Sequence, residues 1–277
     1  MLIRYGFNIE VTLDFPTEII TLLDVHPDRR PQIERETDLR TSQSIQSEIF
    51  IDALGNRSRK IAAQPGRLVL ALDGVVRDSG VPDVQAHDAE CCAIADLPPE
   101  ALPFLMPSRY CETELLSDFS WTNFGAIIGG WAKVEAVCNF VHNHLKFSYP
   151  DARPTRTAVE AFKERSGVCR DFTHLAITLC RALNIPARYC NGYLGDIGIP
   201  PDPAPMDFNA WFEVYLQGRW YTFDARHNMA RIGRILISRG RDAADTAMIT
   251  TFGPHKLERF EVTTEEFVED DALMAAE

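Results

Sequence analysis

Along the first part of the chain, apolar and polar positions alternate at the period of a β-strand. Residues 2–13 alternate cleanly and predict a strand that ends before Pro16. Further strand-like runs follow at 45–51, 57–63 and 67–76, separated by turns that contain Gly or Pro. We therefore expect residues 1–85 to form a β-rich region.

The period changes beyond Pro98, where apolar residues recur at steps of three and four. This spacing predicts a short helix at 100–106, a longer one at about 130–146, and a third that begins at Thr157, which has capping-box spacing to Glu160. A fourth helix follows the Ser166-Gly167 turn, with its apolar stripe formed by Phe172, Leu175, Ala176, Leu179, Cys180 and Leu183.

After Pro186 the pattern returns to strand. A run at 187–194 is followed by a Pro-rich connection at 195–206, a hairpin at 208–224, and a closing strand at 257–262. The whole pattern predicts an α+β fold with an N-terminal β-sheet subdomain at 1–85. A linker at 86–104, a main domain at 105–265 and an acidic tail at 266–277 complete the expected division.

The hairpin has a register that the sequence itself fixes. With Gln217-Gly218 as the two-residue turn, Leu216 pairs with Arg219, so Trp211 lies opposite Asp224. Asn209 and Asp224 then become diagonal neighbours on one face, while Phe208, Ala210, Phe212, Val214 and Leu216 form the core face.

Cys169 stands at the first turn of the fourth helix. A thiol at a helix N-terminus feels the positive end of the macrodipole, which favours the thiolate. Arg165 and Arg170 add positive charge nearby. Cys169 is therefore the candidate nucleophile of the chain.

Composition narrows the choice of partners. The net charge of −12 argues against general binding to nucleic acid or to anionic membranes. No apolar run is long enough to span a membrane, and the N-terminus lacks the pattern of a signal peptide, so we expect a cytoplasmic protein. The oligomeric state cannot be read from the sequence.

The chain has seven cysteines, and their spacing contains no CxxC pair. We expect all of them to be reduced, most as small buried residues. His142 and His144 are two positions apart on a helix and point in different directions, so we expect neither a metal site nor a cofactor. Asp83 is interpreted as one of several scattered surface acids rather than as a calcium ligand.

Four segments together resemble the transglutaminase-like superfamily in its bacterial cytosolic form. They are Gly167-Val-Cys169-Arg-Asp-Phe, Pro186-Ala-Arg-Tyr, Ala210-Trp-Phe-Glu-Val-Tyr and Trp220-Tyr-Thr-Phe-Asp224. The resemblance covers about 105–265, and the β-rich start is similar to the region that precedes this domain in such proteins. It implies a papain-like core, in which the Cys169 helix packs against an antiparallel sheet that carries a histidine and an aspartate.

One position departs from the family pattern. The residue before Ala-Trp is the catalytic histidine of the family, and here it is Asn209. Cys169 matches the nucleophile and Asp224 matches the acid that orients the base. Asparagine accepts no proton near neutral pH, so the base is missing from its place.

Three hypotheses stay open for this departure. Catalysis proceeds weakly from a thiolate supported by the helix terminus and Arg170, or another histidine supplies the base, or turnover has been lost and the cleft serves binding. His227 is nearest to Asp224 in sequence; a continued strand would turn it to the core face, whereas a turn after Asp224 would bring it into the site. His174 lies about 140° around the helix from Cys169 and is expected to be structural.

If the site is active, the resemblance implies acyl transfer. The Cys169 thiolate would attack an amide of a peptide or protein substrate, and backbone N–H groups at the helix start would stabilise the oxyanion. Hydrolysis and cross-linking share this chemistry and differ in the acceptor. Trp211 is either a wall of the acceptor channel or a packed structural residue. The competing interpretation is an inactive binding or scaffold protein on the same fold.

Overall fold

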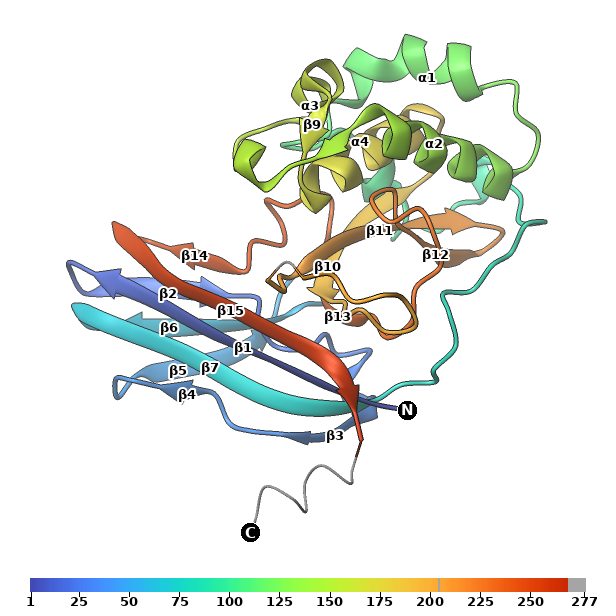
Figure 1. Ribbon diagram of the computed structural model, residues 1–277. Coiled ribbons are helices and arrows are strands. Elements are labelled where there is room, and N and C mark those ends of the chain that lie inside the picture. Colours follow the sequence, from blue (N-terminus) through green and yellow to red (C-terminus); the bar gives the residue numbers. More distant parts are fainter. Residues whose placement is uncertain (204, 269–277) are drawn as a thin grey trace.

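The computed structural model describes residues 1–203 and 205–268 (Figure 1). A β-rich region lies on one side of the molecule and a group of helices on the other, with a small sheet between them. The predicted mixture of helices and antiparallel sheets is confirmed.

The β-rich region contains two sheets of antiparallel strands. One has the order β15-β1-β7-β3, with β4 also paired to β7, and the other has the order β14-β2-β6-β5. Their bounds are β1 (Leu2–Leu13), β2 (Thr17–Thr21), β3 (Ile33–Glu36), β4 (Arg40–Thr41), β5 (Gln46–Ile51), β6 (Arg57–Ala63), β7 (Gly66–Arg77), β14 (Ile249–Thr251) and β15 (His255–Phe267).

β1 is the central strand of the first sheet. The strand predicted at 2–13 is confirmed, and its alternating apolar side chains are buried among those of both sheets. On one side β1 pairs with β7, and on the other with β15, from Leu2↔Phe267 to Leu13↔His255. The segment that was expected to close the main domain therefore lies in the β-rich region, because a strand pattern predicts a strand but not its partner. The expected acidic tail at 266–277 does not begin where it was placed, because Glu266 and Phe267 belong to β15. Residues 269–277 lie outside the described residues.

Four helices lie on one side of the third sheet, and the last of them packs directly against it while the others pack around that helix (Figure 1). They are α1 (Ser117–Phe124), α2 (Gly130–His144), α3 (Ala158–Glu164) and α4 (Cys169–Ala182). The sheet has the order β12-β11-β10-β13, formed by β10 (Ala187–Tyr193), β11 (Asn209–Leu216), β12 (Arg219–Phe223) and β13 (Ile235–Gly240). Two short strands, β8 (Lys146–Phe147) and β9 (Ser166–Gly167), pair in parallel beside α4.

The remaining regular elements are single 3₁₀ turns. They are η1 (Arg30–Gln32), η2 (Ile94–Asp96), η3 (Leu102–Leu105), η4 (Thr113–Leu116) and η5 (Tyr149–Asp151). The helix predicted at 100–106 is thus only the turn η3, since Pro103 restricts it to its first turn and Met106, which precedes Pro107, has an extended conformation that ends it. The predicted capping box is confirmed: Thr157 Oγ1 accepts from the N–H of Glu160, and the Glu160 carboxylate accepts from the N–H of Thr157.

Two hydrophobic cores meet at the third sheet. The first lies between the helices and β11, and it includes Phe172 and Phe212. The second fills the β-rich region but also takes in Tyr193 of β10 and Ile235 of β13. Because β10 and β13 contribute to the second core while β11 contributes to the first, we expect the two regions to unfold together.

A substitution in the β-rich core tests this coupling. Val262→Ala removes two methyl groups from a side chain that is 7% exposed and pairs with Phe7, and we expect it to lower the free energy of unfolding by about 2 kcal/mol. The four tryptophans, Trp121, Trp131, Trp211 and Trp220, all lie outside that core. Their fluorescence should nevertheless report the same shift in urea midpoint as far-UV circular dichroism.

The matched control is Glu261→Ala on the exposed face of β15, which should change stability by less than about 0.5 kcal/mol. A fluorescence transition that does not move in Val262→Ala would show that the two cores unfold independently.

Candidate active site

Cys169 is the first residue of α4, as the sequence predicts. Val168 precedes it in an extended conformation, and the Asp171 carboxylate accepts from the Val168 N–H at 2.9 Å. Gly167 allows this geometry, since a Cβ atom there would lie 2.6 Å from the Asp171 side chain. The turn before the helix and the first helical turn therefore fix each other, and with them the position of the thiol.

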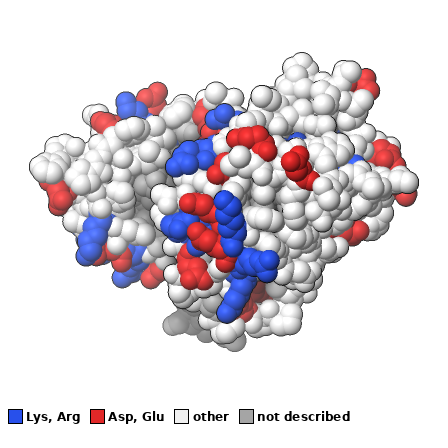
Figure 2. Space-filling view, turned by 90° about the horizontal axis from the view of Figure 1, so that it is seen from above, with Lys and Arg blue, Asp and Glu red and all other residues white. Residues whose placement is uncertain are grey.

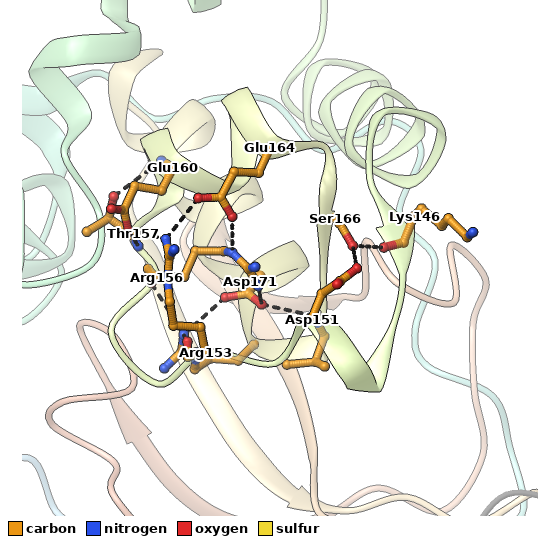
Figure 3. Close-up of polar contacts among 11 residues, drawn as sticks. Lys146, Asp151, Arg153, Arg156, Thr157, Glu160, Glu164, Ser166 and Asp171 are labelled. Atoms are coloured by element: carbon orange, nitrogen blue, oxygen red, sulfur yellow. Dashed lines mark hydrogen bonds and ion pairs between the residues drawn. The ribbon is translucent and has the colours of Figure 1, made fainter.

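A network of ion pairs ties α3 to the start of α4 (Figure 3). Asp171 is buried, and Arg156 bridges it to Glu164 with contacts of 3.1 and 2.9 Å. Arg170 also reaches Asp171 and donates to the carbonyl groups of Arg153, Pro154 and Arg156. The guanidinium of Arg170 thus binds Asp171 and backbone carbonyl groups. These contacts weigh against the hypothesis that its charge supports the Cys169 thiolate directly.

Surface charges on the helical side of the molecule are mixed. Figure 2 shows Lys and Arg lying beside Asp and Glu, with uncharged residues over most of this face. Arg153, for example, pairs with both Glu160 and Glu164 at 2.9 Å. Such pairs cancel much of the local field, so this face presents no patch of a single sign.

The predicted register of the hairpin is confirmed. Leu216 pairs with Arg219 and Glu213 with Thr222, and the ladder ends at Phe212↔Phe223. The core face is also confirmed, because Ala210 and Phe212 pack in the same cluster as α4. Asp224 follows directly after the last pair of the ladder.

Trp211 lies on the opposite face of the sheet. Its side chain is 2% exposed, packs with Cys190 and Leu236, and has the Arg234 guanidinium 5.0 Å from its ring centroid. It does not line the cavity that holds Cys169. This is the position of a packed structural residue rather than of a channel wall.

The chain turns sharply after Asp224. One carboxylate oxygen of Asp224 accepts from the N–H groups of Arg226 and His227, both at 3.0 Å, while its carbonyl accepts from Asn228, which has a φ of 52°. The strand does not continue, so His227 does not turn to the core face. The tight turn brings His227 back toward the side chain of Asp224.

Asp224 and His227 form a hydrogen-bonded pair. The second carboxylate oxygen of Asp224 lies 2.8 Å from His227 Nδ1. Because an ionised carboxylate only accepts hydrogen bonds, Nδ1 must carry the proton, and Nε2 of the neutral ring is left as the acceptor.

Behind this pair lies a buried arginine. Arg234 donates to Asp224 at 3.0 Å and to Asp83 at 2.9 Å. Burial disfavours the ionised form of Asp224, but Arg234 and then His227 outweigh it and hold the pKa of this carboxyl well below its usual range. Asp83 is therefore not a scattered surface acid: it anchors the segment just before the expected linker to the Arg234 side chain and to the N–H of Arg231.

Cys169 and His227 line the same cavity, which has a volume of about 230 Å³. Asn209 and Arg226 also line it, together with residues of the connection before β11 such as Asp207. Asp224 does not line this cavity itself, but it is hydrogen-bonded to His227, which does. The turn after β12 thus places a histidine, oriented by a buried carboxylate, in the cavity of the candidate nucleophile.

Asn209 is held by three hydrogen bonds. Its amide nitrogen donates to the carbonyl groups of Leu194 and Asp207, and its oxygen accepts from Arg226 Nη1 at 3.1 Å. The register places Asn209 and Asp224 on neighbouring strand ends, but the hydrogen bonds that connect them run through Arg226.

The environment of Cys169 favours the neutral thiol. Burial raises the pKa of the Cys169 thiol to about 11, against the opposing effects of Arg226 and of the N–H groups of Ala210 and Arg170. Asp207 adds to the rise through its negative charge. In the unliganded site, burial therefore outweighs the contacts that favour the thiolate, and Cys169 rests as the neutral thiol.

The other histidines of the helical region have structural partners. His174 is fully buried, accepts from the N–H of Ala243 and stacks on Tyr110, and burial keeps its pKa well below the usual value. His142 Nδ1 lies 2.9 Å from the carbonyl oxygen of Arg226, and His144 Nε2 lies 2.7 Å from that of Phe162.

Sequence reasoning missed three charged residues of the site. Arg226 lies between Asp224 and His227, which the sequence had already singled out. Its place in the turn between these two residues was the signal that could have identified it. Arg234 and Asp83 gave no signal, because their pairing joins segments 151 residues apart.

Within the described residues, no group of three or more His, Cys, Asp or Glu side chains has a geometry that could hold a metal ion. None of the helices in this part of the chain is long and apolar enough to cross a membrane.

Comparisons with known proteins fit this geometry. The family model of the transglutaminase-like superfamily matches residues 129–225, which include Cys169, Asn209 and Asp224 but end before His227. A crystal structure of a candidate cysteine protease from Cytophaga hutchinsonii is 30% identical and has a TM-score of 0.82, over 97% of this chain and 92% of that one. The chain belongs to the transglutaminase-like superfamily. The predicted family and core architecture are therefore confirmed.

Two other similar proteins are more distant. An uncharacterized protein from Mycobacterium leprae is 29% identical over 94 residues, which is 33% of each chain. The match thus spans about a third of that curated relative. The periplasmic domain of TgpA from Pseudomonas aeruginosa is 15% identical with a TM-score of 0.41, over 80% of this chain and 88% of that one.

Replacement of Asp224 tests the buried charge cluster. Asp224→Asn leaves Arg234 with one carboxylate fewer and His227 without its charged partner, and we expect the free energy of unfolding at pH 7 to fall by about 3 kcal/mol. The folded-state pKa of Asp224 is lowered, so its contribution is present above the unfolded value of about 3.9 and is lost as the pH falls below it. Urea unfolding at pH 7 and pH 3 should show a smaller difference in the variant than in the wild type.

Asp73→Asn is the control, because Asp73 pairs with Arg4 and Arg40 at the surface and should contribute less than about 1 kcal/mol. An unchanged pH dependence in Asp224→Asn would contradict the assignment of a depressed pKa to this carboxyl.

Proposed function

We propose that the protein is a cysteine-dependent enzyme that cleaves or transfers the acyl group of a peptide or protein amide. Cys169 serves as the nucleophile, His227 as the base and Asp224 as the residue that orients it. The observation that carries the proposal is the 2.8 Å contact between Asp224 and His227, at a histidine that lines the same cavity as Cys169. This arrangement supplies the function that Asn209 cannot perform.

The first step requires a base because the resting thiol is neutral. His227 Nε2 takes the proton of Cys169 Sγ as the sulfur attacks the substrate carbonyl carbon. Asp224, which stays ionised through most of the acid range, stabilises the imidazolium that forms. The N–H groups of Ala210 and Arg170, which lie against the thiol, favour negative charge at this point.

The tetrahedral adduct then collapses. The carbon–nitrogen bond breaks, the leaving amine takes the proton from His227, and a Cys169 thioester remains. In hydrolysis, His227 next removes a proton from water, which attacks the thioester and releases a carboxylic acid and the Cys169 thiol. If a primary amine attacks instead, the product is a new amide.

The alternative is a non-catalytic binding protein on the same fold. Asn209 at the family's base position favours it. The Asp224–His227 pair weighs against it, because a buried carboxylate that orients a cavity histidine has a stability cost that a packed apolar core does not carry. We therefore place the catalytic proposal first.

Turnover of a protein substrate distinguishes these possibilities. Casein serves as the probe, with new amino termini reporting hydrolysis and incorporation of a fluorescent primary amine reporting transfer. Cys169→Ala should abolish both signals, and His227→Ala should lower the rate about 10²- to 10⁴-fold, because it removes the general base.

His255→Ala is the matched control, since His255 lies on β15 in the β-rich region and should leave the rate unchanged. Full activity in His227→Ala would remove His227 from the mechanism. Absence of both products with the wild-type protein would favour the non-catalytic alternative.

A further inference from the structure

Arg226 is a cation placed in the cavity of Cys169. It lies in the turn between Asp224 and His227, and its backbone N–H donates to Asp224. Its side chain extends the other way, with Nη1 3.1 Å from Asn209 Oδ1 and the guanidinium carbon 4.0 Å from the centroid of the Phe147 ring. A neutral amide and an aromatic ring thus hold the guanidinium, and neither cancels its charge.

The orientation of Asn209 is suited to this purpose. Both groups that its amide nitrogen faces, the carbonyl oxygens of Leu194 and Asp207, are acceptors, so the nitrogen must point toward them. The amide oxygen is therefore directed at Arg226. Asn209 therefore acts as a fixed hydrogen-bond acceptor for the Arg226 guanidinium.

Several other groups face the thiol of Cys169. His227 and Tyr149 line the same cavity, Asp207 approaches from the connection before β11, and Tyr189 faces the thiol from β10. Tyr149 and Tyr189 are neutral at physiological pH, because burial raises the pKa of each. Asp207 opposes a negative sulfur, so the positive charge of Arg226 is what offsets it.

We propose that Arg226 is a further catalytic residue, which stabilises the Cys169 thiolate as its proton passes to His227, and that Asn209 is the positioning residue that holds Arg226. The catalytic part of this inference rests on the proposed function. The position that the family pattern assigns to a histidine then serves the reaction through an arginine on the neighbouring turn.

The energetics favour this assignment. Proton transfer from Cys169 to His227 creates one negative and one positive group inside a poorly solvated cavity. Arg226 is first among the groups that lower the pKa of the Cys169 thiol against the effect of burial. Asp224 compensates the imidazolium, so the two products of the transfer each have a counter-charge.

Alkylation of Cys169 by iodoacetamide measures this effect without any substrate. Peptide mass spectrometry should follow Cys169 by itself, because the chain has seven cysteines. At pH 8.5 the rate depends on the thiolate fraction. If Arg226→Gln raises the thiol pKa by about one unit, the thiolate fraction falls about tenfold, and the greater nucleophilicity of the remaining thiolate reduces the loss of rate to about three- to fourfold.

Three further variants separate charge from structure. Arg226→Lys keeps the charge and should retain most of the rate. Asn209→Ala keeps Arg226 but removes the hydrogen bond that holds its guanidinium. We therefore expect an alkylation rate between that of Arg226→Gln and that of the wild type. Arg219 is an exposed arginine that, like Arg226, lies over an aromatic ring, but it is outside the cavity, so Arg219→Gln should have no effect.

Equal alkylation rates in Arg226→Gln and the wild type would overturn the proposal, as would an Arg226→Lys variant as slow as Arg226→Gln. A variant that raises only the KM of an anionic substrate would also overturn it and would make Arg226 a substrate-binding residue. If casein turnover fails but the alkylation rates differ as expected, the proposed function fails while the electrostatic role of Arg226 stands.

Discussion

The carboxylate of Asp224 is the interaction on which the candidate site depends. It caps the turn that ends β12, orients the imidazole of His227 and neutralises the buried Arg234. These three tasks use both oxygens of one side chain that is almost inaccessible to solvent. Because Arg234 also binds Asp83, the same ion cluster joins the hairpin to the segment that precedes the helices. The ion cluster that orients the cavity histidine therefore also holds these two parts of the fold together.

The sequence predicted the local elements of the site well. The helix that begins at Cys169 follows from its apolar spacing, and the hairpin register follows from a two-residue turn with alternating strands. It could not predict how the chain continues after Asp224, because a turn stabilised by an Asp side chain has no strong periodicity. It also could not predict how far burial raises the pKa of the Cys169 thiol, because desolvation depends on what packs above the thiol and not on the helix itself.

The fold was predictable in its class and less so in its connections. Strand patterns marked β1 and residues 257–262 of β15, but strand pairing across the length of the chain leaves no signal in either segment alone. The same limit applies to Arg234, whose partners come from a distant loop and from the hairpin. Local chemistry can be read from spacing, whereas a buried ion pair between remote segments needs the three-dimensional structure.

The pairing of β1 with β15 has a consequence for the order of folding. β1 is made before the other strands that the structure describes, yet one of its two neighbours, β15, is made after all of them. Until then, one edge of β1 stays unpaired and open to other strands. Contacts over such a sequence separation form slowly, so the newly made chain passes through a period in which its first strand can aggregate. Molecular chaperones that shield exposed strand edges would matter most for this protein during that interval.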